Sequence, residues 1–132
     1  MRLYLVIDET YFYHPDFVTD LLRRTKDEVV GAAVITKVPA KSDLSLYLRN
    51  NAALLTWPEK FKLLFSQILF TIKGVSVRSV LKSHRVDFIK VEHDINQPHY
   101  LNSIRSKKPD IIISSNSLRF GTELLKIPTL CC

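Results

Sequence analysis

The sequence predicts an α/β fold in which helices cover both faces of an open, mainly parallel sheet. Short, wholly apolar runs such as Leu3 to Ile7 and Ile111 to Ile113 are typical of strands buried on both faces. Segments with apolar residues at helical spacing separate these runs. Apolar residues make up 46% and charged residues 24% of the 132 residues, which fits a single globular domain with a buried core. These observations together indicate a Rossmann-like domain.

The first third of the chain reads as strand, helix, strand. The run Leu3 to Ile7 predicts a strand that ends at Asp8-Glu9-Thr10. His14-Pro15-Asp16 predicts a helix start, because proline suits the first turn of a helix. A second strand is expected from Glu28 to Ile35, which is rich in valine and alanine.

The middle of the chain, residues 40–75, is expected to be a helical, basic insertion. Pro58 begins its strongest helix, in which apolar residues recur every three or four positions from Phe61 to Ile72. Trp57, Phe61 and Phe65 are expected to be core or docking residues. After the insertion, Ser76 can cap a helix that contains Val77, Val80 and Leu81.

The last third repeats the alternation. It predicts a strand from Val86 to Val91, a helix that starts at Asn96-Gln97-Pro98, and a strand from Ile111 to Ile113. A helical turn is expected between Phe120 and Leu125, before Pro128.

The positive charge is concentrated in the middle of the chain. The whole chain carries +6, with 19 basic and 13 acidic residues. Residues 44–86 hold seven basic residues and one acidic residue, whereas residues 1–43 hold six and seven, and residues 87–132 hold six and five. This segment is either a solvated helical face or a surface for an anionic partner such as a phosphorylated substrate, nucleic acid or an anionic membrane.

Glycine and cysteine exclude several kinds of site. The three glycines, Gly31, Gly74 and Gly121, are too far apart for a dinucleotide fingerprint or a P-loop, which need at least two glycines within about seven residues. Cys131 and Cys132 are adjacent, so they form neither a disulfide framework nor a C-x-x-C metal pair. A reducing, cytoplasmic location is therefore expected. The longest mainly apolar run, Leu63 to Ile72, has ten residues and includes Ser66 and Gln67, whereas a membrane span needs about 20.

The residues that could carry chemistry form no complete catalytic motif. His14, His84, His93 and His99 are expected to be surface or capping residues, and no metal site is expected. Ser114, Ser115 and Ser117 lack the G-x-S-x-G pattern of a hydrolase elbow. A phosphorylation receiver would need an aspartate at the end of the third strand, where Glu92-His93-Asp94 is a poor match. Asp8, Glu9, Thr10 and Tyr11 do follow a strand, where open α/β sheets bind ligands.

Three stretches resemble the formyltransferase family, whose members formylate an amine with 10-formyltetrahydrofolate. Asp8 to Phe12, with the helix and strand through Val34, is similar to the opening of that family. Val80 to Val91, followed by Asp94-Ile95-Asn96-Gln97-Pro98, resembles its third strand and D-I-N-x-P turn. Lys108-Pro109-Asp110 to Cys132 resembles its P-D and L-x-x-P-x-x-G-C segments, with Cys131 in place of the usual glycine.

The resemblance implies a role for several residues. The loop after the Ile111 strand is expected to line the folate pocket, through Asn116, Ser117, Leu118, Arg119 and Phe120. The acceptor amine, carried by a sugar nucleotide or a similar small molecule, is expected near Thr10, Tyr11 and Phe12. In the family an Asn-x-His follows the position of Cys132 at once, with an Asp further on. No catalytic residue is therefore expected within residues 1–132, which are interpreted as the N-terminal, folate-binding part of such an enzyme.

Two other functions are also compatible with the sequence. The alternative is a non-catalytic basic α/β module that binds nucleic acid or an anionic surface, and a third is an inactive relative of the enzymes. The formyltransferase hypothesis predicts stabilisation by folate and no affinity for DNA. The alternative predicts polyanion binding that falls steeply with salt. Association into a homo-oligomer is expected if an apolar sheet edge is exposed.

Overall fold

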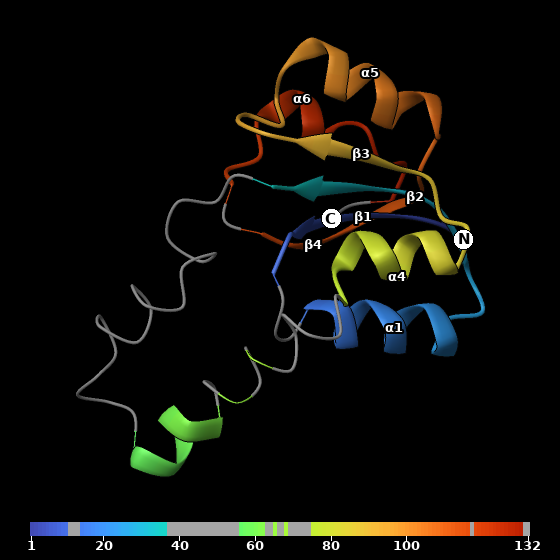
Figure 1. Ribbon diagram of the computed structural model, residues 1–132. Coiled ribbons are helices and arrows are strands. Elements are labelled where there is room, and N and C mark those ends of the chain that lie inside the picture. Colours follow the sequence, from blue (N-terminus) through green and yellow to red (C-terminus); the bar gives the residue numbers. More distant parts are fainter. Residues whose placement is uncertain are drawn as a thin grey trace.

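The computed structural model describes residues 1–10, 14–36, 56–62, 65, 68, 75–116 and 118–130 (Figure 1). Strands and helices alternate along the described chain. In chain order they are β1 (Arg2–Asp8), α1 (His14–Arg24), β2 (Glu28–Ile35), α4 (Val77–Ser83), β3 (Phe88–Val91), α5 (Pro98–Ser106), β4 (Ile111–Ser115) and α6 (Thr122–Leu125).

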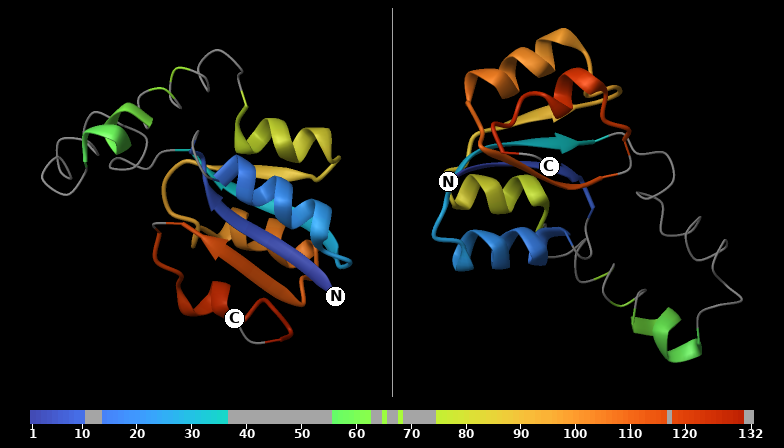
Figure 2. Two further views of the ribbon diagram at one scale, coloured as in Figure 1. Left: turned by 90° about the horizontal axis from the view of Figure 1, so that it is seen from below. Right: turned by 180° about the vertical axis from the view of Figure 1, so that it is seen from behind.

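The four strands form one parallel sheet in the order β3-β2-β1-β4. Helices α1 and α4 cover one face, and α5 and α6 cover the other (Figures 1 and 2). The predicted Rossmann-like α/β class is therefore confirmed. The chain moves outward from β1 through β2 to β3, and then returns to place β4 on the other side of β1. The direction of winding therefore reverses between β1 and β4.

Alternate side chains of β1 fill two separate cores. Tyr4 and Val6 belong to the cluster under α5 and α6, whereas Leu5 and Ile7 belong to the cluster under α1 and α4. This division follows from the two-residue period of a strand. It explains why β1 is apolar without alternation, since both of its faces are covered.

Gly31 lets the Tyr4 ring lie against β2. A Cβ added at Gly31 would lie 2.9 Å from Cε2 of Tyr4, closer than packed carbon atoms approach. The register between β1 and β2 shifts at the same place, between Leu3 and Tyr4. Burial raises the pKa of the Tyr4 hydroxyl, because the charged phenolate would lose its water.

Most predicted elements lie within two residues of the observed ones. β2 has the predicted bounds, and Ser76 caps α4 by accepting a hydrogen bond from the Ser79 N–H (3.2 Å). β3 starts at Phe88 rather than Val86, because the Val86 N–H bonds to the Leu81 carbonyl and closes the turn after α4. Arg85 in that turn adopts a left-handed conformation, with φ of 58°.

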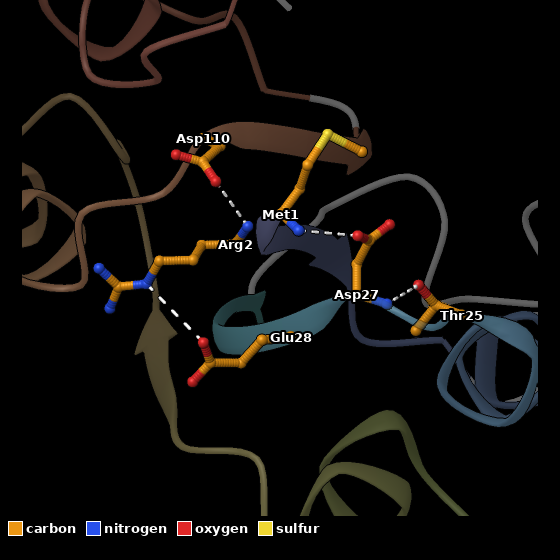
Figure 3. Close-up of polar contacts among 6 residues, drawn as sticks. All are labelled: Met1, Arg2, Thr25, Asp27, Glu28 and Asp110. Atoms are coloured by element: carbon orange, nitrogen blue, oxygen red, sulfur yellow. Dashed lines mark hydrogen bonds and ion pairs between the residues drawn. The ribbon is translucent and has the colours of Figure 1, made fainter.

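The amino ends of the strands are joined by charged and polar groups near the surface (Figure 3). The Met1 ammonium lies 2.8 Å from Asp27 Oδ1, and the Arg2 N–H donates to Asp110 Oδ2 at 2.8 Å. Asp110 also accepts from the Thr129 hydroxyl at 3.1 Å. This set of contacts, called here the amino-edge clasp, ties β1 to the residues that precede β2 and β4.

Only part of the predicted insertion lies among the described residues. Residues 57–62, 65 and 68 are helical, which confirms the predicted helix there with its start one residue before Pro58. The remaining positions between 37 and 74 lie outside the described residues. No helix among the described residues is long and apolar enough to cross a membrane.

Candidate functional site at the carboxyl ends of β1 and β4

The reversal of winding between β1 and β4 defines where a ligand is expected. In open α/β sheets, ligands bind beyond the carboxyl ends of the strands at such a switch point, because the loops there separate to opposite faces. Here the loop after β1 leads to α1 on one face, and the loop after β4 leads to α6 on the other (Figure 2). Asp8 ends β1 and Ser115 ends β4.

His14 joins the two loops at the switch point. Its side chain is buried, with 1% of the residue exposed. Nδ1 lies 2.9 Å from the Thr10 hydroxyl, and Nε2 lies 2.9 Å from the Ser115 hydroxyl. Either ring nitrogen can donate while the other accepts, since a serine or threonine hydroxyl can do both. The imidazole therefore holds the end of β1 and the end of β4 together.

Local sequence explains how His14 reaches this position. His14 is the first residue of α1 and precedes Pro15, which suits the first helical turn. The residue lies four positions after Thr10, whose hydroxyl its ring contacts. His14 was expected to be a surface or capping residue. It is buried, so the expectation of a surface position is wrong. His84, His93 and His99 are exposed, as expected.

A buried ion pair lies next to this bridge. Arg78 Nε is 3.4 Å from Glu9 Oε1, and the Glu9 side chain is only 5% exposed. Arg78 lies in the first turn of α4, two residues after the Ser76 cap. Within the described residues, neither Glu9 carboxylate oxygen nor Arg78 Nε has a hydrogen-bond partner. Buried polar groups usually have such partners, so this pair retains unused hydrogen-bonding capacity.

The loop after β4 is shaped by two asparagines. Asn116 Oδ1 accepts from the Leu118 N–H at 2.7 Å, which forms a tight turn directly after the strand. Further along, Asn96 Nδ2 donates to the Arg119 carbonyl at 3.1 Å, and the Gly121 N–H donates to Asn96 Oδ1 at 2.6 Å. One side-chain amide therefore holds both ends of the Arg119–Gly121 segment.

The Asn96 contact depends on Gly121. A Cβ added at Gly121 would lie 2.8 Å from Asn96 Oδ1, so a larger residue would displace the amide. Asn96 itself is held by Asp94, whose Oδ1 accepts from the Asn96 backbone and side-chain N–H groups at 2.9 and 2.7 Å. The turn after β3 thus fixes the loop after β4, although the two strands lie on opposite edges of the sheet.

The described members of the predicted cofactor loop differ in exposure. Leu118 and Phe120 are half-buried and pack against the core under α5 and α6. Asn116 is half-buried and Arg119 is exposed. Leu118 and Phe120 therefore seat the loop on the core, while the Arg119 side chain faces solvent. Their role in binding a cofactor stays a prediction, and Ser117 lies outside the described residues.

The predicted acceptor-binding residues are only partly described. Thr10 is buried and bonded to His14. Tyr11 and Phe12 lie outside the described residues. Sequence patterns alone did not bring His14, Ser115 and Arg78 into this site, because their contacts join distant parts of the chain. The one available signal was that Glu9, Thr10 and Ser115 all follow strands.

Two other places in the fold differ from this site. A shallow cavity of about 250 Å³ lies between α5 and the amino-terminal halves of the strands, lined by Tyr4, Gly31, Asp87, Lys107 and their neighbours. It is at the opposite end of the sheet from the switch point, and the Lys107–Asp87 ion pair (2.8 Å) lies beside it. No group of three or more His, Cys, Asp or Glu side chains in the described parts of the chain could hold a metal ion.

Comparison with known proteins does not assign this chain to a family. Neither a protein-family model nor a curated protein matches it. The switch-point geometry and the family resemblance of the sequence are therefore the basis for a functional proposal.

Proposed function

We propose that this chain forms the folate-binding part of a formyltransferase that transfers a formyl group from 10-formyltetrahydrofolate to an amine. The acceptor in this proposal is a sugar nucleotide or a similar small molecule, and the reaction is cytoplasmic. The proposal rests first on the sequence resemblance. The observation that supports it best is the His14 bridge, which connects Thr10 of the expected acceptor loop to Ser115 beside the expected folate loop.

A second observation supports the same proposal. The segments that carry the resemblance are in contact, although they are far apart in sequence. Asn96 of the D-I-N-x-P turn bonds to the loop at Arg119 and Gly121. Leu130, in the L-x-x-P segment, donates its N–H to the carbonyl of Asp110, in the P-D segment, at 2.9 Å.

In the proposed reaction, the amine nitrogen bonds to the formyl carbon while the bond from that carbon to the folate nitrogen breaks. The developing oxyanion needs hydrogen-bond donors, and the amine must lose a proton to a base or to water. By the resemblance, an Asn, a His and an Asp that follow the position of Cys132 perform these tasks. The residues described here would bind and orient the donor. The exposed guanidinium of Arg119 suits an anionic group of that donor.

Binding of 5-formyltetrahydrofolate, a stable relative of the donor, tests this proposal by calorimetry without requiring turnover. We expect the chain to bind it and Asn96→Ala to weaken binding about tenfold or more, because the loop is no longer held in one conformation. Asn102→Ala, on the exposed side of α5, is the matched control and should bind like the parent chain. Absence of folate binding by the parent chain, or equal binding by Asn96→Ala, would overturn the proposal. Salt-sensitive binding of a nucleic acid without folate binding would favour the non-catalytic alternative.

A further inference from the structure

The helix at residues 57–62, continued at positions 65 and 68, exposes large apolar side chains. Trp57 is 73% exposed, Phe61 66%, Phe65 63% and Ile68 51%. These four positions are three or four residues apart, so they share one face of the helix. Together they are called here the aromatic stripe. In Figure 1 this helix lies away from the α/β layers. Contiguous exposed apolar surface of this kind usually marks an interaction site.

The start of this helix is specified by its own sequence. Glu59 makes its half of a capping box with Thr56: its Oε2 accepts from the Thr56 N–H at 2.8 Å and from the Thr56 hydroxyl at 2.7 Å. The Lys60 N–H bonds to the Thr56 carbonyl at 3.0 Å. These hydrogen bonds hold the pKa of the Glu59 carboxyl below its ordinary value. The helix thus does not need contacts with the sheet to define its beginning.

Lysines accompany the aromatic stripe. Lys60 Nζ lies 5.7 Å from the Trp57 ring centroid, and the Trp57 and Phe61 ring centroids are 6.2 Å apart. Lys62 lies on the same two turns. Glu59 is the single acidic residue between positions 44 and 86, and its carboxylate is occupied by Thr56. The surroundings of the stripe are therefore positively charged.

We infer that the aromatic stripe docks on an anionic lipid surface. An aromatic face with lysines beside it is the pattern of a helix that lies in the membrane interface, its rings among the acyl chains and its ammonium groups among the headgroups. In a symmetric contact with a second copy, Lys60 and Lys62 would meet like charges, and within residues 56–62 Glu59 is the single acidic side chain, already bonded to Thr56. A nucleic acid binds chiefly through cations on the contact face, whereas the described part of this face carries three aromatic side chains and Ile68 but one lysine, Lys60. Charge and apolarity together therefore favour anionic lipid.

Trp57 is the one tryptophan of the chain, so its fluorescence reports directly on the stripe. We expect emission typical of a water-exposed indole in buffer. We expect a blue shift and co-sedimentation with phosphatidylserine–phosphatidylcholine vesicles, and much weaker effects with phosphatidylcholine alone. High salt should release the protein from the anionic vesicles, because the lysines contribute through charge.

Two double variants separate the apolar and the charged parts of the surface. Phe61→Ser with Phe65→Ser should weaken vesicle binding more than about tenfold, since each buried ring contributes strongly. Lys60→Glu with Lys62→Glu should weaken binding to anionic vesicles about tenfold or more. The matched controls are Phe17→Ser on α1 and the pair Lys82→Glu with Lys90→Glu, all at exposed positions outside this helix. Each control should bind within about twofold of the parent chain, and circular dichroism checks that every variant is folded.

Four results would overturn the inference. The first is Trp57 emission that is already blue-shifted in buffer, which would mean that the chain covers its own stripe. The second is equal binding to neutral and anionic vesicles. The third is a loss of binding in the Lys82→Glu and Lys90→Glu control that equals the loss in the Lys60→Glu and Lys62→Glu variant. Binding would then depend on net charge and not on the stripe. The fourth is a dimer in sedimentation analysis that the two phenylalanine changes abolish, which would identify a second copy as the occupant.

Discussion

The polar groups at the two ends of the parallel sheet differ in their exposure to solvent. At the amino ends of the strands, the amino-edge clasp joins Met1, Asp27 and Asp110 through charged groups near the surface. At the carboxyl ends, Asp8, Glu9, Thr10 and His14 are all buried. Removing the partner of a polar group in contact with water changes the free energy of unfolding little. Removing the partner of a buried polar group lowers it strongly. The difference indicates that the carboxyl end retains polar side chains at a cost in stability, as functional sites do.

The largest change in the free energy of unfolding is expected when the buried Glu9 carboxylate loses its partner Arg78. Arg78→Met should lower the free energy of unfolding by about 3 kcal/mol, at the lower end for a broken buried ion pair because Arg78 is 35% exposed. The double variant Glu9→Gln with Arg78→Met should be more stable than Arg78→Met alone. Urea denaturation measures both, with Arg23→Met on the exposed side of α1 as the control. Simple additivity of the two changes would show that the pair is not coupled.

A smaller loss is expected for the bridge between β1 and β4. His14→Ala removes one buried and one partly buried hydrogen bond and should destabilise the chain by about 2 kcal/mol. His93→Ala, at an exposed position, should change stability by less than about 0.5 kcal/mol. Thermal unfolding of the three proteins provides the comparison. If His14→Ala were as stable as His93→Ala, the imidazole would not be what holds the two strand ends together.

The smallest effect is expected at the amino-edge clasp. The Arg2 N–H and the Thr129 hydroxyl donate to Asp110 and lower its pKa below the ordinary 3.8. A lowered pKa stabilises the folded state above the ordinary value, and this contribution is lost as the pH falls through the folded-state pKa. Asp110→Asn should therefore be slightly less stable than the parent chain at neutral pH, and the difference should shrink below pH 3.8. Urea midpoints measured across this range would contradict the assignment if the difference were independent of pH.

The sequence predicted local features better than contacts. Apolar runs located β1, β2 and β4, a run interrupted by Asp87 and Lys90 located β3, and Ser76 identified the start of α4. Burial pattern and capping are properties of neighbouring residues. The exposure of Trp57 excludes the core, the first of its two expected roles, whereas docking stays a proposal. His14 was missed because its partner Ser115 lies 101 residues away. The contact of Asn96 with Gly121, 25 residues apart, likewise depends on how the chain winds, which periodicity does not encode.

The pairing of β1 with β4 has a consequence for how the chain is made. Leu3 pairs with Ile111 and Ile7 with Ser115, so one edge of β1 stays open until residues 111–115 have left the ribosome. Contacts between such distant residues form slowly, because a long loop must close first. Until then an apolar edge is available to other chains. Among the described residues, the switch-point site is complete only once β4 has paired, so a nascent chain that stops before β4 has three of the four strands but lacks Ser115.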